Sequence, residues 1–289
     1  MNSAAGLVHP AGYGYDNQQA AWRGFPGPVA DGGTAGIIVE AILFDLANTL
    51  LYFNDFDARK FFLEGAADTY GYLREQDVEI PAFKIYALAH MRAFRRRYIW
   101  SSVRRRDFDA MDVMVGVLRK LAIDVPARNQ HILAWMWYRP VAQRASVEPG
   151  THAMLESFRQ RGIKMAIVSN TCAPACCLDR HLEREKLLEF FPTRVYSSHT
   201  FYRKPHPEIF RTALDELGVR PQQALFVGDL IRADIKGARR VGMKTVWKPV
   251  GPTRQPSRRN RPDHIIRKIT DLPTVLTKLL FTNNAPQAI

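Results

Sequence analysis

The sequence predicts an α/β protein with a doubly wound parallel sheet and a smaller, all-helical domain inserted near its start. Two observations predict this fold class. From residue 150 onward, short apolar runs typical of buried strands alternate with segments of helical periodicity. Between residues 56 and 144, by contrast, only helical spacing of apolar residues is found, and no strand run stands out. Alternation of strands and helices favours a parallel sheet whose strand ends meet along one edge.

The elements are expected in a definite order along the chain. The first strand is the apolar run IIVEAILF at residues 37–44, which is typical of a strand buried on both faces. Further strands are expected at residues 164–168, 194–197, 224–227 and 245–247, with an edge strand at 264–266. Helices are expected at residues 58–74, 81–98, 109–121, 129–144, 150–161, 178–188, 207–217, 231–241 and 273–280. Gly218 and Gly242 are placed to end two of these helices.

The composition changes along the chain and predicts its domain boundaries. Residues 1–35 are rich in Gly, Ala and Pro without an apolar period, so a disordered tail is expected. The sheet-bearing core is assigned to residues 36–53 and 148–281, and the helical domain to residues 54–147. Residues 282–289 are expected to form a C-terminal tail.

The chain is strongly basic, with a formal net charge of +13. Such a charge favours small anionic partners through its long-range field. Nucleic acid is a less favoured partner because the basic residues are spread over several segments, although the net charge does not exclude it. No stretch reaches the ~18 apolar residues that cross a membrane. The chain lacks a secretory pattern, and its three cysteines are too few for a disulfide framework, so a cytoplasmic location is expected.

Polar residues follow several of the expected strands. Asp45 comes directly after the first strand, Ser169 and Asn170 follow the second, and Asp229 follows the run ALFV. Ligands bind open α/β sheets at the carboxyl ends of their strands. These side chains are therefore candidates for a single site at one edge of the sheet, and Lys204 lies in a loop before a helix, in RKPHPEIF.

Four ordered segments, FDLANTL, IVSNT, RKPHPEIF and VGDLIRADIKGARRVGMKTVW, carry a family resemblance. They resemble the four motifs of the haloacid dehalogenase superfamily of hydrolases over residues 37–280. The fourth is the most specific, because its glycines and aspartates all fall at the family spacing. The resemblance implies a Rossmann-like core with a helical cap between the first and second motifs.

The resemblance also implies a role for each matching residue. Asp45 corresponds to the nucleophile that forms a covalent intermediate, and Lys204 would neutralise charge at the reacting centre. Mg²⁺ would be bound by Asp45, Asp229, Asp234 and the backbone carbonyl of Ala47, with Asp234 acting through bound water or through Lys204. The Ser169 hydroxyl and the Asn170 amide would hold phosphoryl oxygens.

Ala47 departs from the family pattern. The family's phosphatases carry an aspartate here, which protonates the leaving group and then activates water. Three classes therefore stay open. The first is a hydrolase or slow phosphatase with atypical acid–base catalysis, and the second is a non-catalytic protein that binds a phosphorylated ligand or partner. The third is a phosphonate-cleaving enzyme, whose cap lysine would have to be Lys60, Lys84 or Lys120. A true dehalogenase is less favoured because the Gly-Asp form of the fourth motif is intact.

Other features of the sequence have two interpretations. The arginine runs at residues 95–97 and 104–106 are either an anion-recruiting lid or, as we favour, solvated helix faces. Trp135, Trp137 and Tyr138 are expected in the core of the cap. The spacing of Cys172, Cys176 and Cys177 is a weak zinc pattern, and His206 is expected to form a hydrogen bond within its loop.

Overall fold

The structure is a computed structural model that describes residues 39–53, 57–104, 106–253 and 256–281. The tails expected at residues 1–35 and 282–289 lie outside these ranges. Within them, a main sheet of six parallel strands forms the core. Its strands in chain order are β1 (Ala41–Phe44), β4 (Lys164–Ser169), β5 (Thr193–Tyr196), β6 (Ala224–Gly228), β7 (Lys244–Trp247) and β8 (His264–Ile265).

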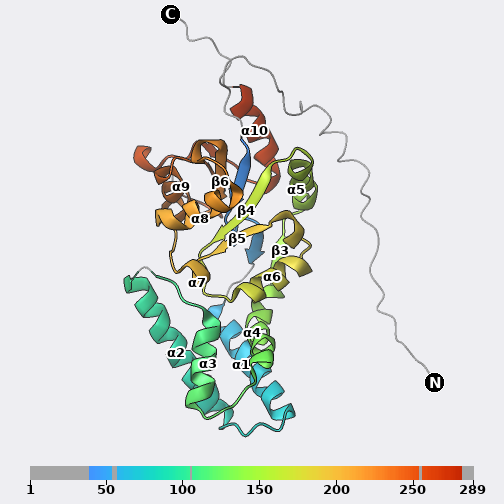
Figure 1. Cartoon of the computed structure of the whole chain (residues 1–289), viewed down its shortest axis with the longest axis vertical. Helices are drawn as coiled ribbons and strands as arrows, with labels where there is room; N and C mark the ends of the chain where they lie inside the picture. Colours follow the sequence, from blue (N-terminus) through green and yellow to red (C-terminus); the bar gives the residue numbers. More distant parts are fainter. Residues whose placement is uncertain (1–38, 54–56, 105, 254–255, 282–289) are drawn as a thin grey trace, which may run out of the picture. The chain divides into compact units, whose positions relative to one another are not determined.

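Strand β1 lies inside the sheet, whose order is β5-β4-β1-β6-β7-β8. Ile42 pairs with Met165 of β4 on one side and with Leu225 of β6 on the other. All residues of β1 are buried because helices cover both faces of the sheet, as Figure 1 shows. The carboxyl ends of β1, β4 and β6 therefore lie next to one another along one edge.

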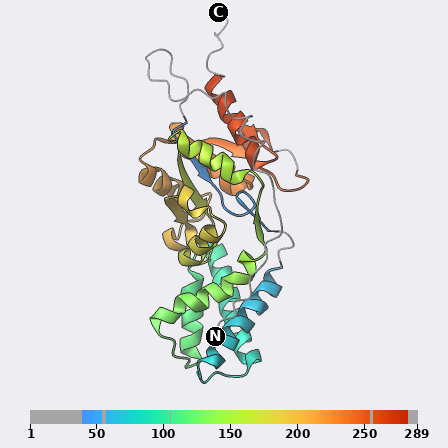
Figure 2. The same cartoon turned by 90° about the vertical axis from the view of Figure 1, so that its right-hand side faces the viewer.

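Two helical layers cover the sheet. Successive residues of β1 face opposite layers, with Ile42 and Phe44 on one side and Ala41 and Leu43 on the other. The first layer consists of α5 (Thr151–Gln160), α6 (Ala175–Arg184) and α10 (Leu272–Phe281). The second consists of α8 (Pro207–Leu217) and α9 (Lys236–Arg240), while the short α7 (Ser197–Thr200) follows β5. Figure 2 shows the red α10 next to the yellow-green α5.

Four helices form the cap, which Figure 1 shows as a separate group coloured cyan to green. They are α1 (Ala58–Glu75), α2 (Phe83–Arg104), α3 (Ala110–Lys120) and α4 (Ala127–Ala142). Asp57 and Asp109 accept hydrogen bonds from the first backbone amides of α1 and α3, and thereby begin these helices. The four helices surround a small core that includes Leu73, Tyr86 and Leu133.

A two-stranded antiparallel sheet lies where the chain leaves the core for the cap and where it returns. It pairs β2 (Leu51–Phe53) with β3 (Ala145–Val147). Neither strand was predicted, because three residues are too few to show an alternating pattern.

The predicted α/β class with a helical cap is confirmed, although some boundaries differ. Helix α2 continues to Arg104 instead of ending at residue 98, because no glycine or proline interrupts its second half. The helix expected at residues 231–241 begins as a π-helical turn, Ile231–Ile235, and continues as α9. Gly218 and Gly242 both adopt positive φ, as expected of residues that end helices. No helix in the described ranges is long and apolar enough to span a membrane.

Candidate active site

Asp45, Lys204 and Asp234 meet at the carboxyl edge of the sheet. Asp45 directly follows β1, and its backbone amide donates to the carbonyl of Val227, which holds it against β6. The Lys204 ammonium lies 2.6 Å from Oδ1 of Asp45 and 2.8 Å from Oδ1 of Asp234. All three side chains are buried, so their charges interact with little screening by water.

The segment after β6 brings Asp229 and Asp234 into the same cluster. Asp234 lies in the π-helical turn Ile231–Ile235, where its Oδ2 accepts a hydrogen bond of 2.8 Å from the backbone amide of Leu230. The carboxylate packs directly against Gly228, where a Cβ atom would come within 2.5 Å of it. Gly228 is therefore required by this close approach, which explains why a glycine stands six residues before Asp234 in the fourth motif.

The electrostatics of this cluster suit a divalent cation. Asp45, Asp229 and Asp234 each offer a carboxylate oxygen, and these atoms lie within 4.8 Å of one another. Burial, together with repulsion from the neighbouring carboxylates, raises the pKa of Asp229 to about 7. Burial likewise raises the pKa of Asp234 to about 6, against the opposing effect of Lys204. Burial alone would lower the pKa of Lys204, but Asp234 and Asp45 raise it above its ordinary value.

A hard dication such as Mg²⁺ prefers carboxylate oxygens and would relieve this repulsion. The donor set thus fits the metal that the resemblance implied. Ala47, whose backbone carbonyl was expected to contribute a further ligand, lies two residues after Asp45 and is exposed.

Ser169 and Asn170 lie at the end of β4, beside β1. The Ser169 side chain is buried at this edge. The Asn170 side chain forms two hydrogen bonds with the backbone of Lys204: its Oδ1 accepts from the amide at 2.7 Å, and its Nδ2 donates to the carbonyl at 3.0 Å. This side chain therefore fixes the Lys204 loop, a contact that the motif alone did not predict.

A cavity of about 700 Å³, which we call the apolar pocket, adjoins this cluster between the sheet edge and the cap. The α/β core contributes Ala47, Ser169 and Asn170 to its lining, and the cap contributes mainly aromatic and methionine side chains. The full lining consists of Leu46, Ala47, Asn48, Leu51, Phe53, Ala58, Phe61, Phe62, Phe94, Ala110, Met111, Met114, Ala134, Trp137, Tyr138, Val141, Ser169, Asn170, Thr171, Cys172, Ala173, Pro174, Leu178 and Val250.

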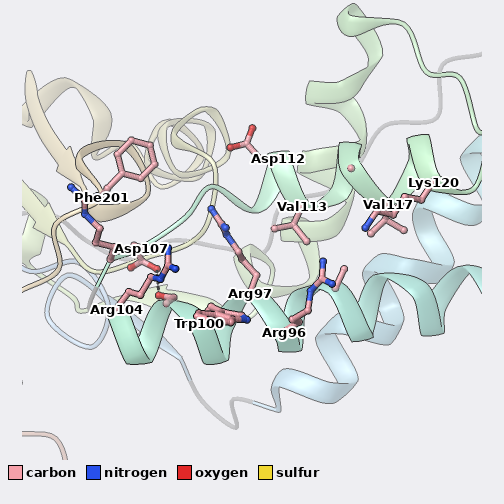
Figure 3. Close-up of a pocket in the computed structure, with 14 residues that line it drawn as sticks. Arg96, Arg97, Trp100, Arg104, Asp107, Asp112, Val113, Val117, Lys120 and Phe201 are labelled. Atoms are coloured by element: carbon pink, nitrogen blue, oxygen red, sulfur yellow. Dashed lines mark hydrogen bonds between the residues drawn. The ribbon is translucent and has the colours of Figure 1, made fainter.

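A second cavity, of about 730 Å³, lies between α2 and α3, and we call it the basic groove. Figure 3 shows Arg96 and Arg97 pointing from α2 toward α3. Within the described ranges, none of its five cationic side chains belongs to an ion pair. The groove is lined by Ala93, Arg96, Arg97, Trp100, Ser101, Arg104, Arg106, Asp107, Asp112, Val113, Gly116, Val117, Lys120 and Phe201.

The buried Asp107, which lines the groove, forms contacts with residues of the α/β core. Its carboxylate accepts hydrogen bonds from Ser197 Oγ at 2.7 Å and Ser101 Oγ at 3.3 Å, and lies 3.4 Å from Nε of Arg203. Asp107 is thus already bonded within the protein. The groove's arginines are exposed, and three of them, Arg97, Arg104 and Arg106, lie over the aromatic rings of Phe108, Trp100 and Tyr202.

The sequence missed the wall of the apolar pocket. Trp137 and Tyr138 pack against the cap core, as predicted, but they also line the pocket together with Phe61, Phe62 and Phe94. An apolar helix face gives no signal that distinguishes a core position from a cavity wall. His206 forms the local hydrogen bond that was expected of it, by accepting from the backbone amide of Glu208.

Similarity to known proteins extends over the residues that form this site. A family described as haloacid dehalogenase-like hydrolase matches residues 39–242. Glyceraldehyde 3-phosphate phosphatase of Pyrococcus abyssi is 38% identical over 99 residues, which cover 34% of this chain and 41% of the relative. The enzyme of the same name from Pyrococcus furiosus is 32% identical over 141 residues, which cover 49% of this chain and 58% of the relative. The chain therefore spans about half the length of these curated relatives.

The fold is also similar to solved structures. A HAD phosphatase from Thermococcus onnurineus superposes with a TM-score of 0.53 at 24% identity, covering 82% of this chain and 97% of the other. At this level of identity, the likeness concerns the fold alone.

Proposed function

Since the chain belongs to the haloacid dehalogenase-like hydrolase family, we propose that it is a Mg²⁺-dependent hydrolase of a small phosphorylated substrate. The observation that carries the proposal is the buried cluster of Asp45, Lys204 and Asp234, with contacts of 2.6 and 2.8 Å at Lys204. Such a cluster supports the proposal because the reaction would need a nucleophilic carboxylate, a neutralising ammonium and acidic metal ligands close together.

In the proposed reaction, a carboxylate oxygen of Asp45 attacks the phosphorus atom, the bond between phosphorus and the ester oxygen breaks, and the alcohol leaves as an aspartyl phosphate forms; water then attacks this intermediate, which releases phosphate and regenerates Asp45. Lys204 holds Asp45 in place and offsets negative charge as the phosphoryl group transfers. The Ser169 hydroxyl and the backbone amide of Asn170 would bind phosphoryl oxygens. Bound to Asp45, Asp229, Asp234 and the Ala47 carbonyl, Mg²⁺ would supply charge neutralisation.

Ala47 limits this chemistry, because a methyl group can neither protonate a leaving group nor activate water. General acid–base catalysis contributes roughly 10²–10⁴-fold to rate. The proposed enzyme is therefore slow toward esters of weakly acidic alcohols. Esters of more acidic alcohols depend less on protonation and are the better substrates.

A second candidate function is a non-catalytic protein that binds a phosphorylated ligand or partner on the same scaffold. The same observation favours it, since Ala47 removes the acid–base group and leaves the binding residues in place. The phosphonate-cleaving alternative has less support. Among the described residues, neither Lys60 nor Lys84 lines the apolar pocket, and Lys120 lines the basic groove.

The proposal is tested by trapping the intermediate. Purified protein with Mg²⁺ is mixed with an activated aryl phosphate, quenched in acid and digested, and the peptide that contains Asp45 is examined by mass spectrometry. A phosphorylated Asp45 peptide, with a burst of released alcohol before a slower steady state, is expected. Asp45→Asn should show neither signal, while Ser157→Ala, at a half-buried position of α5 that lines neither cavity, serves as the control. Unphosphorylated wild type that still binds the ester would favour the binding protein.

A further inference from the structure

The apolar pocket is lined without a single charged side chain, although it opens on a phosphate-binding edge. Its lining residues include no Asp, Glu, Lys, Arg or His. Six aromatic and two methionine side chains form much of the wall: Phe53, Phe61, Phe62, Phe94, Trp137, Tyr138, Met111 and Met114. In a protein with a net charge of +13, the absence of charge from this lining is a specific property of the cavity.

Three polar side chains of the lining are bonded within the protein, whereas Nε1 of Trp137 is buried without a hydrogen-bond partner among the described residues. The Asn170 side chain is held by the Lys204 backbone at 2.7 and 3.0 Å. Thr171 Oγ1 accepts from the backbone amide of Ala173 at 3.0 Å, and the Tyr138 hydroxyl shares a hydrogen bond of 3.0 Å with Nδ1 of His181. A charged ligand group would therefore find no side chain of opposite charge in this lining, and a ligand with several hydroxyls would find mainly the Asn48 side chain and the indole N–H of Trp137.

We propose that the pocket binds the apolar body of the substrate, and that the substrate class is a phosphate monoester of an aromatic alcohol. This inference rests on the proposed function, because it assumes that the phosphoryl group lies at Asp45, Lys204 and Ser169. An aromatic ring fits a wall of Phe, Trp and Met side chains through offset or edge contacts and sulfur–ring contacts. The cavity of about 700 Å³ is large enough for a fused ring system.

Ala47 supports the same substrate class from a different direction. It lines the pocket, and it occupies the motif position at which the family's phosphatases carry the acid that protonates the leaving group. When Asp45 attacks, the bond between phosphorus and the aryl oxygen breaks, and its electron pair leaves on an aryloxide. The ring delocalises that charge, so the aryloxide departs without an acid and takes its proton from water afterward. An aliphatic alkoxide has no such stabilisation.

A substrate whose alcohol part carries several hydroxyl groups is expected to bind weakly, because burying an unpaired hydroxyl costs free energy. Each hydroxyl buried without a partner lowers affinity by roughly 5- to 100-fold. A sugar or polyol phosphate would bring several such hydroxyls into this cavity. An aromatic ring brings none beyond the ester oxygen.

The test uses four phosphate esters that differ in two properties, the apolar area of the alcohol part and its acidity as a leaving group. 2-Naphthyl phosphate and phenyl phosphate have leaving groups of similar acidity but different apolar area. Cyclohexylmethyl phosphate has an apolar body and a poor leaving group, and glucose 6-phosphate has a polar body and a poor leaving group. With wild-type protein and Mg²⁺, we expect the KM to be at least about tenfold lower for the naphthyl than for the phenyl ester. The kcat should fall sharply for cyclohexylmethyl phosphate, with a smaller change in KM.

Two substitutions in the pocket are compared with matched substitutions outside it. Val141→Thr and Met111→Gln place polar atoms in the wall with little change of volume. Val103→Thr and Ile99→Gln make the same types of change on the exposed face of α2, outside both cavities. We expect the pocket variants to raise the KM for 2-naphthyl phosphate about three- to tenfold and to leave kcat nearly unchanged. The controls should match wild type.

The outcomes distinguish this inference from the proposed function. Turnover that favours glucose 6-phosphate over both aryl esters would overturn the substrate class while the hydrolase proposal stands. Pocket variants that behave like their controls would also overturn it. If no ester is consumed, calorimetric binding decides: tight binding of 2-naphthyl phosphate that Met111→Gln weakens supports the pocket assignment although the hydrolase proposal fails, and equal binding of 2-naphthyl and glucose phosphates rejects it.

Discussion

The apolar pocket and the basic groove have nearly equal volumes, about 700 and 730 Å³, but their linings are opposite in character. The pocket beside Asp45 has no charged lining residue, whereas half of the groove's lining is charged, with five cations and two carboxylates. Helices α2 and α3 each contribute to both cavities: Phe94 of α2 and Met111 of α3 line the pocket, whereas Arg97 of α2 and Asp112 of α3 line the groove.

This difference shows where the basic character of the chain lies. A net charge of +13 suggests a positively charged substrate pocket. The buried Lys204 is instead paired with two carboxylates at the site, and five cations without a carboxylate partner among the described residues line the groove between α2 and α3. The net positive charge is therefore found in the lining of the basic groove, whereas the lining of the apolar pocket carries no charge.

The largest expected effect comes from the carboxylates beside the apolar pocket. Asp45→Asn should lower kcat for an aryl phosphate by about 10³-fold or more, because an amide is a far poorer nucleophile. The matched change in the groove, Asp112→Asn, should leave kcat within about twofold, since Asp112 is exposed on α3. Steady-state kinetics with Mg²⁺ measures both. Similar kcat values for the two variants would contradict the assignment of the catalytic carboxylate to the site beside the apolar pocket.

Ala47→Asp tests the role of the uncharged lining, because it introduces one carboxylate into the apolar pocket. It should raise kcat for cyclohexylmethyl phosphate by about 100-fold, since the new carboxyl group can protonate a poor leaving group. It should also raise the KM for 2-naphthyl phosphate, because the carboxylate must be desolvated beside the ring. Ala47→Asn is the control of equal size without an acid. If both variants remain at wild-type kcat while folded, acid–base catalysis is not what this site lacks.

The pocket side should also be the more sensitive to acid. Burial lowers the pKa of His181, which holds Tyr138 in the pocket wall, from 6.5 to about 4. The unfolded chain takes up a proton below pH 6.5 while the folded protein does not, so stability is complete above this pH and is lost as pH falls toward 4. The loss from this residue at pH 5 is about 2 kcal/mol.

Calorimetry measures this effect as the change in melting temperature between pH 7 and pH 5. His181→Asn retains a hydrogen-bonding group without the titration, so its melting temperature should fall less over this interval. His152→Asn, at an exposed position on α5, should behave as wild type. An equal pH response in all three proteins would mean that His181 is not buried in its neutral form.

The smallest effect is expected in the groove. Arg97→Gln should lower kcat/KM about two- to threefold at low ionic strength, with no change in kcat, because it weakens only the long-range attraction of an anion. Arg119→Gln removes the same charge from an exposed position on α3 outside the groove and should give a similar loss. Both losses should disappear at high salt. A much larger effect of Arg97→Gln would assign the groove a specific ligand.

The sequence predicted the central part of the fold well because local and long-range preferences agree there. The buried run before Asp45 forms an interior strand, and Gly228 lies so close to the Asp234 carboxylate that a Cβ atom at this position would come within 2.5 Å of it. Periodicity also predicted four cap helices. It could not predict which face of α2 would meet which neighbour, because this depends on tertiary packing. The apolar pocket and the basic groove therefore became visible only with the structure.

The two hydrogen bonds between the Asn170 side chain and the Lys204 backbone have a consequence for which amino acids position 170 can accept. One bond needs an acceptor and the other a donor, at 2.7 and 3.0 Å, on a side chain of fixed length. Aspartate offers acceptors only, serine is shorter, and glutamine carries its amide one methylene farther out. Among the twenty residues, asparagine alone meets all three conditions. Position 170 should thus tolerate variation as poorly as position 45, although its side chain is occupied by the protein's own backbone.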